Sequence, residues 1–185
     1  MISMGGIIMK KKIRQGKISD FSRLSWAWDN NPSTLKVFKQ RMNMGIQEFW
    51  VIESLEKDNN GNLPVELAGE FHIVWDSPDP DEADGEARAY LCAFRVHPDY
   101  RGLGLGKNLM EGVLSRVSQV GRTQVTIGVK QNRPEIKEIY HKWGFTELVK
   151  LKTVDHHNFN EQGEPNPTDF PIELYLKYLS KNNKN

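Results

Sequence analysis

A short glycine-rich run in the middle of the chain has the composition of a phosphate-binding loop. Gly102, Gly104 and Gly106 alternate with leucines, and the cations Arg101 and Lys107 stand at its two ends. Glycines let an anion approach the backbone closely, and a helix that begins here would point free N–H groups and the positive end of its dipole at that anion. Taken alone, the pattern fits a phosphate site or simply a tight turn between a strand and a helix.

The residues around this run argue against two common classes of phosphate loop. A nucleoside-triphosphatase loop has Ser or Thr after its Gly-Lys pair, whereas Asn108 follows Lys107. In a dinucleotide-binding fold, the glycine turn follows the first strand of a repeated βαβ unit. Several predicted antiparallel strands precede the turn in this chain, so neither class fits.

The periodicity of apolar residues predicts the elements that hold the loop in place. In chain order we expect a strand over 12–16, helices starting at Ser19 and Ser33, strands over 47–55, 65–75 and 87–96, a helix after the glycine run, a strand over 124–129, a helix from Pro134 to Gly144, and strands over 145–151 and 172–179. The segments 76–86 and 154–169 show no periodicity and are expected to be loops. The fold class is therefore α/β, of the α+β kind: one domain with a mixed, mostly antiparallel sheet of six or seven strands flanked by helices.

The composition indicates a soluble globular protein. The chain has 185 residues, of which 38% are hydrophobic and 26% charged, with a net charge of +1. This balance gives no general attraction to nucleic acid or membranes, and we expect neither as a partner. The single cysteine, Cys92, cannot form an internal disulfide and favours a cytoplasmic location. We expect the domain to cover 9–180, with flexible termini at 1–8 and 181–185 and Met9 as an alternative start.

The strand before the glycine run, together with the run itself, resembles the signature of the GNAT superfamily of N-acetyltransferases. Residues 94–106 read FRVHPDYRGLGLG. In this segment Val96, Pro98 and the series Arg-Gly-x-Gly-x-Gly occupy the positions of the family's pattern.

A second block of residues supports the same resemblance. Asn132 follows the next predicted strand, and Tyr140, Gly144 and Phe145 are similar to the family's Tyr-x-x-x-Gly-Phe. Together the two blocks cover about residues 90–148, while residues 1–86 carry no specific match.

The resemblance implies that acetyl-CoA is the co-substrate and lies in a splayed central cleft. In the family, the end of the central strand pairs with the pantetheine arm and the glycine loop takes the pyrophosphate; the strands that splay would be 87–96 and 124–129. Backbone groups left open in this way suit an arm that contains amides. The residues that the resemblance assigns to the cofactor are Phe94, Val96, Arg101, Gly102, Leu103, Gly104, Leu105, Gly106, Lys107, Asn132 and Tyr140.

The implied reaction is direct attack by a primary amine of a small molecule or peptide on the thioester, without a covalent enzyme intermediate. By resemblance Tyr140 donates a proton to the leaving thiolate, although it shares a helix face with Ile136 and Trp143 and could be only a core aromatic. The family does not fix the base. Our candidate is Glu70, which lies on one strand face with His72; the alternative is that both simply face solvent.

Several other features have two interpretations. The acidic loop 76–86 either attracts a cationic amine or is merely solvated. The segment 154–169 could form a wall of the acceptor pocket, and the aromatic residues of the first half of the chain line that pocket or belong to the core; they are Trp26, Trp28, Phe38 and Trp50. His156 and His157 have no further Cys or His at a ligand spacing, so we expect no metal.

Two functions of other classes stay open at this point. One is a non-catalytic acyl-CoA-binding regulatory module, which needs the glycine loop but no proton donor. The other is a nucleotide-binding protein unrelated to CoA. A homodimer is one option for the assembly.

Overall fold

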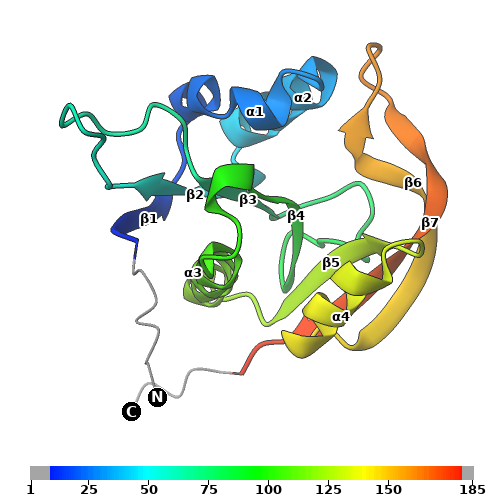
Figure 1. Ribbon diagram of the computed structural model, residues 1–185. Helices are drawn as coiled ribbons and strands as arrows, with labels where there is room; N and C mark the ends of the chain where they lie inside the picture. Colours follow the sequence, from blue (N-terminus) through cyan, green and yellow to red (C-terminus); the bar gives the residue numbers. More distant parts are fainter. Residues whose placement is uncertain (1–8, 181–185) are drawn as a thin grey trace.

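A mixed sheet of seven strands organises the part of the chain that the computed structural model describes, residues 9–180 (Figure 1). The strand order is β1-β2-β3-β4-β5-β7-β6, and only the β4–β5 pair is parallel. The strands are β1 (Lys11–Gln15), β2 (Gln47–Ser54), β3 (Gly69–Val74), β4 (Arg88–Val96), β5 (Gln124–Lys130), β6 (Glu147–Phe159) and β7 (Pro165–Tyr178). The α-helices are α1 (Ser25–Trp28), α2 (Pro32–Asn43), α3 (Leu105–Val120) and α4 (Pro134–Lys142), with 3₁₀ turns η1 (Ile18–Arg23) and η2 (Pro98–Tyr100). The predicted fold class is confirmed.

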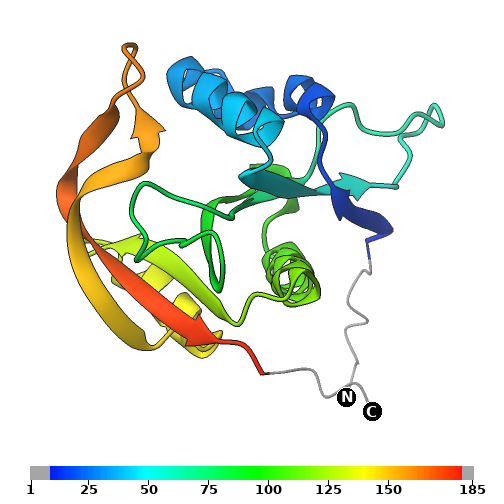
Figure 2. The ribbon, with the colours of Figure 1, turned by 180° about the vertical axis from the view of Figure 1, so that it is seen from behind.

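Helices cover the two faces of the sheet, and each face has its own hydrophobic core. Figures 1 and 2 show α1 and α2 on one side of β2–β4 and α3 on the other. Alternation along the strands explains the division: Phe71 of β3 packs toward α3, whereas Phe49 of β2 packs toward Trp28 and Phe38. No helix of residues 9–180 has both the length and the apolar character needed to cross a membrane.

The centre of the sheet splays where β4 leaves β5. The two strands pair only from Arg88 with Gln124 to Leu91 with Ile127, and the rest of β4 has no partner on that side. A bulge between β3 and β4 accompanies the separation, because Ala93 and Phe94 lie opposite a single residue of β3. Ala93 has a left-handed φ of 49°. A bulge bends and twists its strand, so the carboxyl half of β4 leaves backbone groups free on the β5 side. This is the separation of the two strands that the resemblance implied.

The helices after the central strand end where the sequence predicts, whereas the first helices begin at other residues than predicted. Gly121 and Gly144 end α3 and α4 with φ of 93° and 90°, the left-handed conformation that glycine adopts at little cost. The predicted helix with Ser19 as its N-cap is wrong, because Asp20 accepts the Lys17 N–H and closes a 3₁₀ turn instead. The second helix begins at Pro32 rather than Ser33, with Asn31 as its N-cap.

The predicted loop over 154–169 is wrong in the structure. Most of it belongs to a long hairpin of β6 and β7, whose turn around Gly163 (φ 78°) is closed by hydrogen bonds between Asn160 and Glu164. In Figure 1 the orange hairpin extends beside α2. Apolar and polar residues do not alternate along β6, because it is an edge strand whose neighbours change along its length. One end lies against the sheet and the other against α2, so no single face is buried throughout.

Two further expectations need correction on the β3 side of the sheet. The strand expected over 65–75 covers only Gly69–Val74, because Leu67 instead donates its N–H to the Arg23 carbonyl. The loop 76–86 joins two antiparallel strands as predicted, but it is not simply solvated. Glu82 and Ala83 are completely buried, and Asp79 is 8% exposed.

Candidate active site

The glycine run forms the turn into α3, and each glycine has a steric reason. Gly102 and Gly104 have φ of 79° and 75°, with open space where a Cβ would stand. At Gly106 a Cβ would lie 3.0 Å from the Phe94 ring. The N–H groups of Gly102, Leu103 and Gly104 donate to no backbone carbonyl within residues 9–180. The turn therefore presents free donors at the start of a 16-residue helix, the arrangement that binds anions.

A cleft of about 740 Å³, which we call the loop cleft, lies beside this turn. It runs between the unpaired half of β4 and helix α4. Its lining includes four of the predicted cofactor residues, namely Phe94, Val96, Arg101 and Tyr140. Arg101 is held there by the hydrogen bond from its Nε to the Val96 carbonyl, 3.2 Å, and can reach an anion at the turn.

The other predicted cofactor residues lie nearby but do not line the loop cleft. Leu105 is 1% exposed and anchors the first turn of α3, and Lys107 is exposed beside Glu111, with 3.8 Å between Nζ and Oε1. Asn132 is exposed in the turn after β5, whereas its neighbour Arg133 does line the cleft. The sequence pattern therefore missed Arg133.

A second cavity of about 320 Å³, the inner cavity, lies between α2, the splayed strands and the β6–β7 hairpin. Phe94, Arg95 and Tyr140 line both the inner cavity and the loop cleft. The two spaces therefore meet at these three side chains, beneath the unpaired part of β4. A molecule bound in one space can reach a molecule bound in the other only at this junction.

Tyr140 is the titratable hydroxyl at the junction. Burial raises its pKa to about 12, so the phenol stays protonated at neutral pH. Its ring packs at the edge of the core near Phe145 and Trp143, while no hydrogen-bond partner within residues 9–180 occupies its hydroxyl. The side chain is thus a core aromatic that also lines a cavity, and its role as a proton donor stays a prediction.

Glu70 lies on the same face as His72, as predicted, but neither faces solvent. Both side chains are 0% exposed. Glu70 Oε2 accepts from Trp28 Nε1 at 3.0 Å and from His72 Nε2 at 2.9 Å, and Oε1 accepts from Arg95 at 3.0 Å. Glu70 lines neither the loop cleft nor the inner cavity. In this arrangement it holds Arg95 at the junction, and direct contact with an amine would require breaking these bonds.

Arg95 is a site residue that the sequence pattern did not single out. Its guanidinium stacks on Trp28 at 4.3 Å and donates to the Ala27 carbonyl as well as to Glu70. The only sequence signal for Arg95 is its position between the predicted cofactor residues Phe94 and Val96. In a strand, this position places its side chain on the opposite face. Of the four aromatics with two interpretations, Trp28 is a buried core residue and Trp50 packs on the α3 core. Phe38 belongs to the core and also lines the inner cavity, and Trp26 lines the loop cleft.

We predict that Glu70→Gln destabilises the protein by about 2 kcal/mol. The amide must present a donor to one of the three donors that now surround the carboxylate, and Arg95 loses its counter-ion. The value lies below the ~3–5 kcal/mol of a fully buried pair because the Arg95 side chain is 32% exposed. Chemical denaturation measures the change, with Glu147→Gln at an exposed position of β6 as the control.

The same variant tests the assignment of Glu70 as the base. If Glu70 only positions Arg95, the pH dependence of kcat/KM keeps its shape in Glu70→Gln. Loss of the acidic limb of that profile, where kcat/KM rises as the base loses its proton, with stability unchanged, would contradict the positioning role and support proton transfer to Glu70.

A buried polar network joins the acidic loop to the hairpin. Glu82 Oε2 accepts from Ser77 Oγ at 2.7 Å and from His157 Nε2 at 2.8 Å, and Oε1 contacts the ammonium of Lys152. Arg41 of α2 donates to His157 Nδ1 at 3.0 Å. No sequence pattern indicates this network, because its members lie far apart in the chain.

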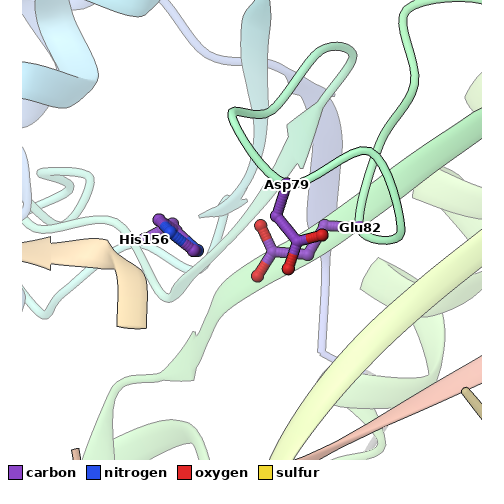
Figure 3. Close-up of side chains that lie close together, drawn as sticks. All are labelled: Asp79, Glu82 and His156. Atoms are coloured by element: carbon purple, nitrogen blue, oxygen red, sulfur yellow. The ribbon is translucent and has the colours of Figure 1, made fainter. Parts of the chain in front are cut away.

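Three members of this region could together hold a metal ion. Figure 3 shows Asp79 and Glu82 from the loop and His156 from β6, whose ligand atoms lie within 4.8 Å of one another. Two ammonium groups already neutralise the carboxylates, however: Lys150 Nζ lies 2.8 Å from Asp79, and Lys152 contacts Glu82. The donor set is therefore satisfied by ion pairs, and the expected absence of a metal stays a prediction.

The buried histidines predict how stability depends on pH. Burial lowers the pKa of His72 and lowers that of His157 further. The unfolded chain binds these protons near pH 6.5 and the folded chain does not. The free energy of unfolding should therefore be constant in this respect above about pH 7 and fall below pH 6.5, by up to about 1.4 kcal/mol per pH unit for each histidine.

Denaturation at pH 7.5, 6.5 and 5.5 measures this dependence. In His157→Gln, which has one titrating histidine fewer, the free energy of unfolding should fall less steeply between pH 6.5 and 5.5. The difference in slope should equal the contribution of one proton. An equally steep slope in the variant, or a flat profile in the natural protein, would contradict the neutral state of the buried histidines.

Comparison with known proteins adds the following findings. The model of the acetyltransferase (GNAT) domain matches residues 83–160, and no curated protein gave a match. The fold is similar to that of NAA60 from Arabidopsis thaliana in complex with acetyl-CoA, with a TM-score of 0.66, 18% identity, and 92% of this chain and 99% of that chain covered.

Two further structures show the same likeness. An N-acetyltransferase from Staphylococcus aureus Mu50 aligns with a TM-score of 0.62 and 12% identity over 92% of this chain and 99% of that chain. A chimera of the spermidine N-acetyltransferase SpeG from Vibrio cholerae and hSSAT aligns with a TM-score of 0.60 and 11% identity over 91% and 95%. At these identities the likeness is one of fold.

Proposed function

We propose that this chain, which carries a GNAT acetyltransferase domain, transfers the acetyl group of acetyl-CoA to a primary amine of a small molecule or peptide. The domain match contains the glycine turn, β5 and α4, and the described residues have the fold of solved GNAT acetyltransferases, so the resemblance drawn from the motifs is confirmed. The proposal concerns the amine acceptor, the mechanism and the residues that carry it.

The observation that carries the proposal is the junction of the loop cleft and the inner cavity. The unpaired edge of β4 lines the loop cleft, and the free donors of the glycine turn lie beside it, next to Arg101. A pyrophosphate at the turn and an amide-containing arm along β4 would use these groups. The thioester end of that molecule would then reach the junction, where the inner cavity opens.

The inner cavity gives the acceptor its own place, separate from the cofactor. Attack then occurs in a ternary complex, with the two reactants held in line across the junction. The amine nitrogen loses a proton to solvent and forms a bond to the thioester carbonyl carbon, and the carbon–sulfur bond breaks. The thiolate takes a proton, and Tyr140 is the protonated group at the junction that can supply it.

Arg95 is the second polar group at the junction. Its guanidinium is fixed by Glu70, Trp28 and the Ala27 carbonyl. Held in this way, it is oriented before the substrates bind, which is the condition under which a donor contributes to a reaction rather than to binding alone. We assign it to the orientation of the acyl group or of the acceptor.

A thiol-release screen tests the proposal. The protein is mixed with acetyl-CoA, and in parallel with longer acyl-CoAs, and with a panel of primary amines, and free CoA thiol is measured over time. We expect amine-dependent release with acetyl-CoA. Tight acetyl-CoA binding without release for any amine would favour a non-catalytic binding module, and stabilisation by adenine nucleotides equal to that by acetyl-CoA would favour a nucleotide-binding protein.

A further inference from the structure

The inner cavity has a second opening, away from the acyl-transfer junction. An outer pocket of about 380 Å³ lies at the base of the hairpin tip, and it shares Lys130, Asp155 and Asn158 with the inner cavity. None of these three lines the loop cleft. The cofactor side and the outer side of the inner cavity are thus lined by different residues, and an acceptor that enters from outside passes Asp155 before it reaches Tyr140.

Asp155 is a carboxylate without a direct cationic partner. No cation lies within 4.0 Å of it among residues 9–180, and its Oδ1 accepts a hydrogen bond from the His157 N–H at 2.9 Å. Of the nearby cations, Lys152 contacts Glu82, whereas Arg41 donates only to the neutral His157 ring and the His156 carbonyl and interacts with Asp155 from a longer distance.

The other charges at this opening neutralise each other. Lys130 Nζ lies 2.7 Å from Asp169 Oδ1, and among the described residues that line the inner cavity Asp155 is the one acid, without a cation in direct contact. Its field reaches into the inner cavity: after burial, the main cause, Asp155 contributes to the raised pKa of the Tyr90 hydroxyl, which lines that cavity. A half-buried, unpaired carboxylate attracts a cation more strongly than an exposed one, because solvent screens it less.

We propose that Asp155 binds a second positive charge of the acceptor, so that the preferred acceptor is a dication such as an alkyl diamine, acetylated at one end while its other ammonium group is held at the outer opening. This inference rests on the proposed acyl transfer. The amine that attacks must lose its proton at the junction, whereas the ammonium at Asp155 keeps its charge. Asp155 is then a specificity-determining residue that takes no part in proton transfer.

A pair of acceptors of equal length tests the inference. With acetyl-CoA saturating, kcat/KM is measured for 1,5-diaminopentane and for 1-aminopentane. We expect the natural protein to prefer the diamine by about 10- to 100-fold, the value of one charge-assisted hydrogen bond. In Asp155→Asn, which still accepts the His157 N–H, that ratio should fall toward one, mainly through a higher KM for the diamine.

The control is Asp169→Asn, which removes the neighbouring acid whose charge Lys130 already neutralises, and this variant should keep the preference. Calorimetric titration of 1,5-diaminopentane into the CoA-saturated protein gives a readout without turnover, and its Kd should rise at least 10-fold in Asp155→Asn only. An unchanged ratio in Asp155→Asn, or equal losses for both amines, overturns the inference while acyl transfer stands. Diamine binding that depends on Asp155, without thiol release for any amine, would support an ammonium site at Asp155 but contradict acetylation of the other end and acyl transfer itself.

Discussion

Replacement of Tyr140 by phenylalanine should lower kcat by about 10²- to 10⁴-fold, the contribution of a positioned general acid. Phenylalanine keeps the ring packed near Phe145 and Trp143, so acetyl-CoA affinity and stability should change little. Because burial raises the pKa of Tyr140 to about 12, the natural protein keeps its acid protonated throughout the neutral range. Steady-state thiol release at saturating substrates, from pH 6.5 to 9.5, measures the effect.

The matched control is Tyr178→Phe, at an exposed position near the end of β7, which should keep full turnover. Full turnover at saturating substrate in Tyr140→Phe across this pH range would remove Tyr140 from the mechanism. The residue would then be the core aromatic of the alternative interpretation.

Gly104→Val should raise the Kd for acetyl-CoA at least 100-fold. Gly104 has a φ of 75° and open space beside it, so the valine side chain would fill the place of the anion and force the turn out of its left-handed conformation. The free N–H groups of the turn would then point away from a pyrophosphate. Calorimetric titration of acetyl-CoA measures the affinity.

Gly163→Val provides a control with the same backbone cost. Gly163 has a φ of 78° in the hairpin turn, also with open space beside it, and it lines neither the loop cleft nor the inner cavity. We expect Gly163→Val to lower stability but to leave acetyl-CoA affinity near that of the natural protein. Equal losses of affinity in the two variants, or an unchanged affinity in Gly104→Val, would contradict pyrophosphate binding at the turn.

The sequence predicted the central part of the site because that part is local. The glycine turn, the strand before it and the helix after it are contiguous, and each glycine is required by its own backbone or by the adjacent Phe94 ring. Tyr140 could be placed as well, because Pro134 begins α4 and Gly144 ends it within a few residues. Local chemistry of this kind is readable from a single sequence.

The acceptor side of the site could not be predicted because it depends on contacts between distant segments. Alternation places Glu70 and His72 on one face, but that face is buried only because Trp28, Phe21 and Phe38 from distant segments pack on it. Asp155 was hidden in a segment expected to be a loop, since an edge hairpin with different neighbours along its length shows no alternation.

Acyl transfer in a ternary complex is tested most directly by measuring both products of the same reaction. Free CoA and acetylated amine are quantified over time, and the intact protein is weighed by mass spectrometry at each point. The account predicts one acetylated amine for each CoA released, in amounts that exceed the protein many times, with no acetyl group on the protein. CoA release without acetylated amine, or an acetylated protein that passes its acetyl group to the amine, would contradict it.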